Sequence, residues 1–140
     1  LVTYFEMKKR AAEYGMNADM LAKNDIVIEG ALRSLEICKR HGVQVAYGTD
    51  LLGALQSEQS EEFSIRAQVV KPIEIIRSAT SIGARLLRME GKLGCLKPGA
   101  FADLIVVDGN PLKNLKLLQE QGKHLSAIMK GGHFHKNRLN

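Results

Sequence analysis

The sequence has no tryptophan, few other aromatic residues and only two cysteines among its 140 residues. Cys38 and Cys95 lie far apart in the chain, and each has apolar neighbours. We therefore expect reduced, buried thiols rather than a disulfide framework, as is usual in the cytosol. No cysteine pair has the spacing of metal ligands, so a cysteine-based zinc module is not indicated.

Long hydrophobic runs are also missing. No apolar stretch approaches the about 20 residues that a bilayer-spanning helix needs, and no charged-then-apolar leader precedes the first predicted helix. We therefore expect a soluble, cytoplasmic protein that does not bind membranes. The chain begins at Leu1 with a helical pattern already under way, which is typical of a chain cut from a longer one.

The formal net charge is +5, but the basic residues are scattered along predicted helices. The densest basic run, Lys8-Lys9-Arg10, is short and has no aromatic residues between its members. This pattern favours a solvated helix face over a nucleic-acid interface, so we predict no nucleic-acid binding. With 45% hydrophobic and 25% charged residues, the composition is typical of a globular domain or part of one.

The first half of the chain is predicted to contain two helices followed by a short strand. The pattern is helical from Val2 to Tyr14, and a second helix is expected between an Asn17 N-cap and His41. Val43 to Tyr47 is a run of β-prone residues without clean alternation, which suits a strand covered on both faces, as in a parallel sheet. Together these elements predict half of a βαβ unit.

More helices are predicted after this strand. Ser60 has the position of an N-cap for a helix that runs towards Val70, with acidic residues in its first turn. Pro72 is placed to begin another helix, because a proline in the first turn loses no hydrogen bond. A further helix is expected to start at Thr80 or Ser81.

The last part of the chain is predicted to be rich in β-structure. Lys97-Pro98-Gly99 fits a type II turn, and Leu104 to Val107 is a strongly β-prone run. A short helix is expected from Pro111 to Gln119. The glycine pair after Lys130 then indicates a hairpin of two strands.

Asp50 follows the predicted strand directly. In parallel α/β folds, ligands bind at the carboxyl ends of strands, so a carboxylate at this point is placed for catalysis or binding. The alternative is that Asp50 caps the next segment. The spacing of the residues leaves both alternatives open.

Two other clusters of potential ligands have simpler explanations. His133 and His135 would share one face of a strand and could meet one metal ion, but no third ligand is near, so an exposed strand face is favoured. Glu58, Glu61 and Glu62 follow Asp50 closely, and capping of a helix is the favoured explanation for them. The sequence has no Gly-rich phosphate loop, nucleophile elbow or Cys-His signature.

Three motifs carry a resemblance to a known family. YGTDLLG at Tyr47–Gly53 is similar to the end of the eighth barrel strand of metal-dependent amidohydrolases. GCLKPGAFADLIVVDGNPL at Gly94–Leu112 is similar to the return of that family into a small β-sandwich, and QSEEF at Gln59–Phe63 supports a peptidase-like branch. The chain thus resembles, over essentially its whole length, the imidazolonepropionase-like group that includes Xaa-Pro dipeptidases and Xaa-Arg or Xaa-Lys carboxypeptidases.

The resemblance implies an α/β fold. Residues 1–90 would form the last helices and the final strand of a (β/α)8 barrel, and residues 91–140 would form a β-rich segment of the small sandwich domain. A last barrel strand normally pairs with two neighbours, so a lone one leaves open edges. We therefore expect the chain to bind the missing amino-terminal portion of the barrel or to form homo-oligomers.

The resemblance also implies a function. The family hydrolyses amide bonds with a divalent metal centre, usually binuclear zinc, which suggests a dipeptide or an N-acyl amino acid as substrate. Asp50 would be a metal ligand and the catalytic base, and Leu51 and Leu52 would contact substrate. The family's histidine ligands and its carboxylated lysine would lie upstream of Leu1, so this chain alone is predicted to be inactive. The alternative is a non-catalytic truncated module that self-associates.

Overall fold

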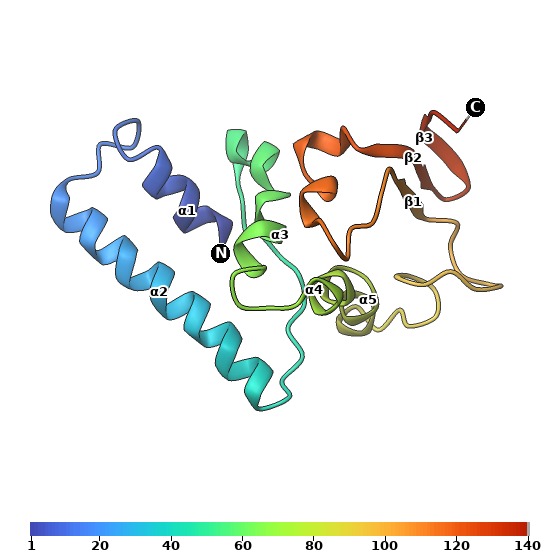
Figure 1. The fold of residues 1–140 in the computed structure, drawn as a ribbon, viewed down its shortest axis with the longest axis horizontal. Coiled ribbons are helices and arrows are strands. Elements are labelled where there is room, and N and C mark those ends of the chain that lie inside the picture. The colour runs from blue at the N-terminus through green and yellow to red at the C-terminus, as the bar shows by residue number, and fades with distance from the viewer. Residues whose placement is uncertain (140) are drawn as a thin grey trace.

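The computed structural model describes residues 1–139 and shows a mixed helix and strand chain that ends in a small antiparallel sheet (Figure 1). In Figure 1 the long second helix lies at one side of the molecule and the sheet lies at the opposite side, with the short helices between them. The amino terminus lies beside these short helices. The mixture of helices and strands predicted from the sequence is present.

The first two helices are α1, Val2–Lys9, and α2, Ala18–Arg40. Asn17 caps α2 as predicted, because its side chain accepts a hydrogen bond of 2.9 Å from the backbone N–H of Met20. Helix α1 ends earlier than the predicted Tyr14, since the backbone leaves helical geometry at Arg10 with φ −108° and ψ 29°. The predicted cap at Asn17 therefore located a helix end correctly, whereas the helical pattern up to Tyr14 did not.

The predicted strand at Val43–Tyr47 is absent from the part of the chain that the structure describes. Residues 43–52 have no regular secondary structure. Tyr47 donates one backbone hydrogen bond of 3.0 Å to the carbonyl of Ser78, which belongs to a helix. The prediction is wrong because a β-prone run becomes a strand only where another strand pairs with its backbone, and none of the described strands lies beside it.

Short helices follow this segment. Helix α4 begins at Pro72 as predicted, and the side chain of Glu74 accepts a hydrogen bond from the backbone N–H of Lys71 before it. Helix α5 begins at Ser81, also as predicted, whereas α3 ends at Arg66 and does not reach Val70. The bounds are η1 Gly53–Glu58, α3 Glu61–Arg66, α4 Pro72–Ala79 and α5 Ser81–Leu86.

The sheet consists of β1, Leu104–Val107, β2, Leu125–Lys130, and β3, His133–Asn137, in the order β1-β2-β3 with antiparallel pairing. Both glycines of the predicted hairpin have positive φ, 56° at Gly131 and 81° at Gly132, which is the geometry of a type I′ turn. Within 111–119, where a helix was predicted, the structure has only the 3-10 turn η2, Leu115–Leu118, and a second 3-10 turn, η3, Glu120–Gly122, follows it.

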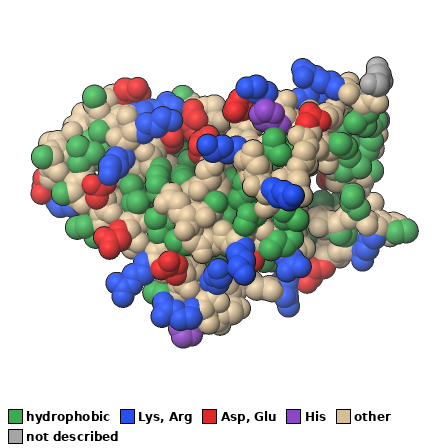
Figure 2. Space-filling model, in the orientation of Figure 1, with side chains coloured by type: hydrophobic (Ala, Val, Ile, Leu, Met, Phe, Trp, Pro, Cys, Tyr) green, Lys and Arg blue, Asp and Glu red, His purple; other side chains and the backbone are tan. Residues whose placement is uncertain are grey.

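A small apolar core joins α1 to the segment after α2 and to α3. Val2, Leu51 and Ile65 are buried and pack together in it. Many other large apolar side chains lie at the surface, where Figure 2 shows them as broad green areas between the charged groups. Leu52 and Leu96 are both 79% exposed, and Leu86 is 72% exposed. Within residues 1–139, none of the helices combines the length and the apolar character that crossing a membrane requires.

Candidate active site around Asp50

Asp50 lies in the irregular segment between α2 and η1, and its side chain is exposed. Its backbone adopts the left-handed conformation, with φ 56°. The residues after it point in different directions, since Leu51 is buried in the apolar core and Leu52 is among the most exposed side chains. The predicted contact of Leu51 and Leu52 with a substrate stays a prediction.

The structure decides against one of the two alternatives for Asp50. The segment that follows it is η1, and the N-cap position of η1 is Leu52, with no side-chain hydrogen bond to the cap. Asp50 therefore does not cap the next helix. An exposed carboxylate that is not used for capping is available to bind a cation or to transfer a proton.

Helix α1 fixes the peptide just before Asp50. The hydroxyl of Thr3 donates a hydrogen bond of 3.0 Å to the carbonyl of Thr49, and the carbonyl of Asp50 lies 3.5 Å from the same hydroxyl. Because Thr3 belongs to the first turn of α1, this bond ties two segments that are far apart in the sequence. The main chain at Asp50 is thus held from one side by α1.

Glu62 and Arg66 of α3 form a buried ion pair, and Arg66 contacts the segment that leads to Asp50. The carboxylate of Glu62 is completely shielded from solvent, and its Oε1 accepts a hydrogen bond of 2.7 Å from Nε of Arg66, one turn further along α3. Its Oε2 accepts a hydrogen bond of 2.8 Å from the backbone N–H of Val2. Glu62 lies in the first turn of α3 as predicted, but its carboxylate does not cap the helix, because its oxygens accept hydrogen bonds from Arg66 and from the backbone of Val2.

Arg66 connects this ion pair to the segment of Asp50. Its Nη1 donates a hydrogen bond of 3.2 Å to the carbonyl of Ala46, and its guanidinium lies 5.1 Å from the centroid of the Tyr47 ring. The Tyr47 ring packs on Phe63, with 4.7 Å between the ring centroids. A guanidinium in such a position gains a cation–π attraction in addition to its hydrogen bonds.

Tyr47 is a hydrogen-bond donor in this arrangement. Its hydroxyl donates to the carbonyl of Gln59 at 2.9 Å. Burial raises the pKa of the phenol far above its ordinary range, the charge of Glu62 raises it further, and Arg66 partly opposes both effects. The phenol therefore stays protonated and keeps its bond to Gln59 at any ordinary pH.

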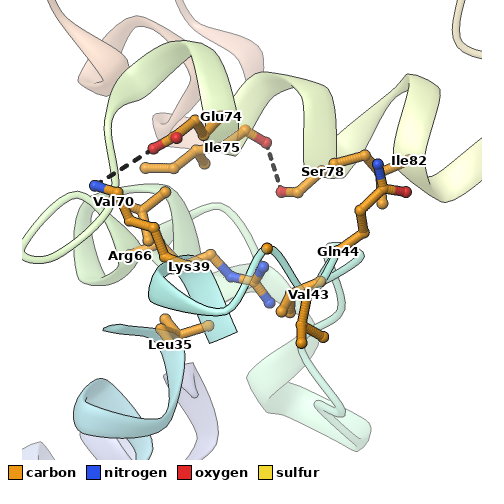
Figure 3. A pocket seen from close by; sticks show the side chains of 12 residues that line it. Leu35, Lys39, Val43, Gln44, Arg66, Val70, Glu74, Ile75, Ser78 and Ile82 are labelled. Atoms are coloured by element: carbon orange, nitrogen blue, oxygen red, sulfur yellow. Dashed lines mark hydrogen bonds and ion pairs between the residues drawn. The ribbon is translucent and has the colours of Figure 1, made fainter. Parts of the chain in front are cut away.

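Two cavities lie close to these residues, and Asp50 lines neither of them. One has a volume of about 200 Å³ and lies between α2, α3 and α4 (Figure 3). Arg66 is part of its wall, and Lys39 and Glu74 form an ion pair of 3.6 Å at its edge. The other, of about 280 Å³, separates Tyr47 and Phe63 from the small sheet.

The other predicted clusters do not assemble near Asp50. His133 and His135 are exposed on β3, and Glu58 pairs with Arg10 at 2.9 Å. Among residues 1–139, no three His, Cys, Asp or Glu side chains gather closely enough to bind a metal ion. The described residues therefore do not by themselves supply the donor set of a binuclear metal centre.

The sequence of this chain matches a known protein family. Residues 2–133 match the family model described as amidohydrolase family. The chain belongs to the amidohydrolase family. Members of this family generally use divalent metal ions.

Solved structures of amidohydrolases resemble this chain closely. It is 45% identical to an amidohydrolase whose crystal structure superposes with a TM-score of 0.88, over 98% of this chain and 33% of the other. It is 39% identical, with a TM-score of 0.86, to a prolidase solved in complex with N-methylphosphonate-L-proline, over 96% of this chain and 33% of the other. The chain thus spans about a third of the length of these solved relatives.

A curated relative is ochratoxinase from Aspergillus niger. The two sequences are 28% identical over 119 residues, which are 84% of this chain and 25% of ochratoxinase. The amidohydrolase chain therefore covers about a quarter of this relative. The relatives of this chain thus include a prolidase and ochratoxinase.

Sequence reasoning missed Tyr47 and Arg66 as parts of the site. The spacing of Glu62 and Arg66, four residues apart in a predicted helix, was the available signal for an ion pair. This spacing is the same for exposed and for buried pairs, so it did not show that the pair is buried or that Arg66 contacts Ala46 and Tyr47.

Proposed function

We propose that this chain is the carboxyl-terminal part of a metal-dependent amidohydrolase that hydrolyses the amide bond of a dipeptide or an N-acyl amino acid. The observation that carries the proposal is the exposed carboxylate of Asp50 on a main chain fixed from several sides. The similarity to a prolidase supports a dipeptide or a related amide as the substrate class.

Asp50 has two proposed tasks, which a carboxylate combines well. It binds a divalent cation, with zinc as the preferred candidate and with the remaining ligands supplied from outside this chain. When bound, such an ion polarises the amide carbonyl and lowers the pKa of water. Asp50 takes a proton from the attacking water as the new C–O bond forms, and it gives that proton to the amine nitrogen as the C–N bond breaks.

The proposal assigns the two parts of the chain to two domains. Residues 1–90 contribute the last helices of a (β/α)8 barrel, with 43–47 as its final strand once neighbouring strands are present. The residues from 91 onward contribute strands to a small sandwich domain. The antiparallel sheet β1-β2-β3 supports the second assignment, since it has the β-rich character expected for this part.

A non-catalytic role is the second candidate. Exposed apolar side chains such as Ile26, at 70%, and Leu52, at 79%, favour a module that self-associates. In this case the chain would assemble with copies of itself and would hydrolyse nothing. The two candidates are distinguished by whether substitution of Asp50 changes turnover.

The experiment uses the full-length protein that carries this chain, loaded with a divalent metal and assayed on a panel of dipeptides and N-acyl amino acids. Asp50→Asn is expected to lower kcat by about 10²- to 10⁴-fold, because the amide cannot accept the proton. Asp108→Asn, a change at another exposed aspartate, is the matched control and should leave kcat unchanged. Unchanged turnover in Asp50→Asn, or a purified protein that binds no divalent metal, would overturn the proposal.

A further inference from the structure

Asp50 belongs to a short stretch of main chain, residues 46–50, that is held by side chains and carbonyls from three helices. Arg66 of α3 binds the carbonyl of Ala46, and the carbonyl of Ser78 in α4 receives the N–H of Tyr47. Thr3 of α1 binds the carbonyl of Thr49. Among the described residues the segment has no strand partners, and these contacts fix it at its two ends.

Arg66 makes the most extensive of these contacts. A planar guanidinium has five N–H donors in a fixed fork, so it can serve several partners at once. Here Nε faces Glu62 at 2.7 Å, Nη1 faces the carbonyl of Ala46 at 3.2 Å, and the plane lies over the ring of Tyr47. The side chain is only 8% exposed, so water competes little for these donors.

Glu62 sets the direction in which Arg66 points. Its carboxylate is buried and fixed on both oxygens, by Arg66 on one and by the backbone of Val2 on the other. A buried charge pair is sensitive to geometry, because each partner loses its hydration and depends on the other. The guanidinium thus cannot move away from Ala46 and Tyr47 without breaking its bond to Glu62.

We infer that Arg66 is a positioning residue for Asp50: with Glu62 behind it, Arg66 fixes residues 46–47 and thereby sets the place of the Asp50 carboxylate. The inference rests on the proposed function, since it assigns Arg66 a part in the reaction of Asp50. Arg66 does not touch the substrate in this scheme. It acts through the main chain, over a stretch short enough that a shift at Ala46 is passed on to Asp50.

The first variant is Arg66→Lys in the full-length enzyme. Lysine keeps a positive charge near Glu62, but its ammonium group has no planar fork to serve Glu62, Ala46 and the Tyr47 ring together. We expect kcat to fall by about 10- to 100-fold, as for a misplacement of about 1 Å at a catalytic group. KM should change much less, because the binding groups of the substrate are not moved.

A structural readout accompanies the kinetics. Amide hydrogen exchange in peptides that cover residues 43–52 should become faster in Arg66→Lys, while exchange in β2 and β3 stays as in the wild type. A residue with a purely structural role would raise exchange throughout the molecule. Ala127→Gly, a change at a fully buried position of β2, is the control for general destabilisation and should leave kcat unchanged at a temperature where it is folded.

A second variant covers the case in which Arg66→Lys does not fold. The double variant Glu62→Leu with Arg66→Met removes both charges at once, which a buried site tolerates better than one unpaired charge. It should fold, yet show the same loss of kcat, since the hydrogen bond from Arg66 to the carbonyl of Ala46 is then missing. A folded double variant with wild-type kcat would overturn the inference.

Asp50→Asn, measured in parallel, distinguishes a failure of the proposed function from a failure of the positioning role of Arg66. If Asp50→Asn keeps its turnover, the proposed function fails and the inference fails with it. If Asp50→Asn is inactive but Arg66→Lys has wild-type kcat and wild-type exchange at residues 43–52, only the positioning role fails. A loss of kcat in both variants, with faster exchange confined to 43–52 in Arg66→Lys, supports both.

Discussion

Nε of Arg66 lies 2.7 Å from Oε1 of Glu62, and both side chains are almost completely shielded from solvent. The pair therefore differs from the surface ion pairs of this chain, such as Lys23 with Asp19, whose side chains are mostly exposed. Burial makes the two charges depend on each other, because neither can be hydrated when its partner is lost.

Removing one member of this pair should destabilise the protein strongly. Glu62→Ala is expected to lower the free energy of unfolding by about 3–5 kcal/mol, because it leaves the Arg66 guanidinium buried without a counter-charge. Urea unfolding followed by circular dichroism measures this change. Lys23→Ala removes an exposed pair and should cost less than about 1 kcal/mol. Equal effects of the two changes would contradict the burial of the pair.

Gly94 should not tolerate a side chain. A Cβ at this position would lie 2.5 Å from the backbone carbon and oxygen of Thr80, and φ is 65°. Gly94→Ala is expected to lower the free energy of unfolding by about 2–5 kcal/mol, the sum of overpacking and a left-handed backbone.

Gly99→Ala is the matched control for Gly94→Ala. Gly99 also has a positive φ, 83°, but its Cβ would meet no atom within 4 Å. Only the backbone term of about 1–2 kcal/mol remains there. Thermal unfolding of both variants measures the difference, and a smaller loss in Gly94→Ala than in Gly99→Ala would refute the close contact with Thr80.

Tyr47 should make the protein less stable in alkaline solution. Burial, together with the charge of Glu62, raises the pKa of this phenol from its ordinary value of 10.0. A group whose pKa is raised on folding contributes stability that is fully present below the unfolded pKa and is lost as pH rises above it. The free energy of unfolding should therefore fall as pH rises past about 10, because only the unfolded chain then releases this proton.

Tyr47→Phe tests whether the Tyr47 phenol causes this loss of stability at alkaline pH. The variant loses the hydroxyl bond to Gln59, at a cost of about 1 kcal/mol, but its stability should depend less on pH above 10. Chemical unfolding at a series of pH values from 8 to about 11 provides the slopes, in the range where a phenol titrates. Tyr14→Phe, at an exposed tyrosine, should keep the wild-type slope.

The exposed apolar side chains predict association of the 140-residue chain. Leu52, Leu86 and Leu96 are each more than 70% exposed, and burying such side chains against another copy of the chain removes apolar surface from water. Sedimentation velocity should therefore show a sedimentation coefficient that rises with concentration. The triple change of these leucines to glutamine should shift the chain towards monomer, whereas a wild-type chain that is monomeric at every concentration would contradict the prediction.

Local signals in the sequence predicted several elements of the fold correctly. The cap at Asn17, the helix start at Pro72 and the glycine hairpin after Lys130 all depend on residues within a few positions of each other. Such features are determined by backbone chemistry, so tertiary contacts are not needed to recognise them.

Features that depend on distant partners were not predicted. The strand expected at residues 43–47 requires neighbouring strands, and its β-prone side chains alone did not produce one. The burial of Glu62 follows from the approach of α1 and Arg66, which the local sequence does not reveal. The sequence drew attention to Asp50 but left capping and catalysis open as its roles. The structure removed capping, because Asp50 is exposed and makes no capping bond at η1.

The left-handed backbone at Asp50 restricts which amino acids evolution or an engineer can place there. At φ 56° a β-branched or bulky side chain is strained, while aspartate, asparagine and glycine are accepted with little penalty. Glutamate, although it bears the same charge, would meet this conformational barrier and would also carry its carboxylate one methylene further. Libraries that randomise this codon should thus yield folded proteins enriched in three residue types, and among these only aspartate has an acidic group.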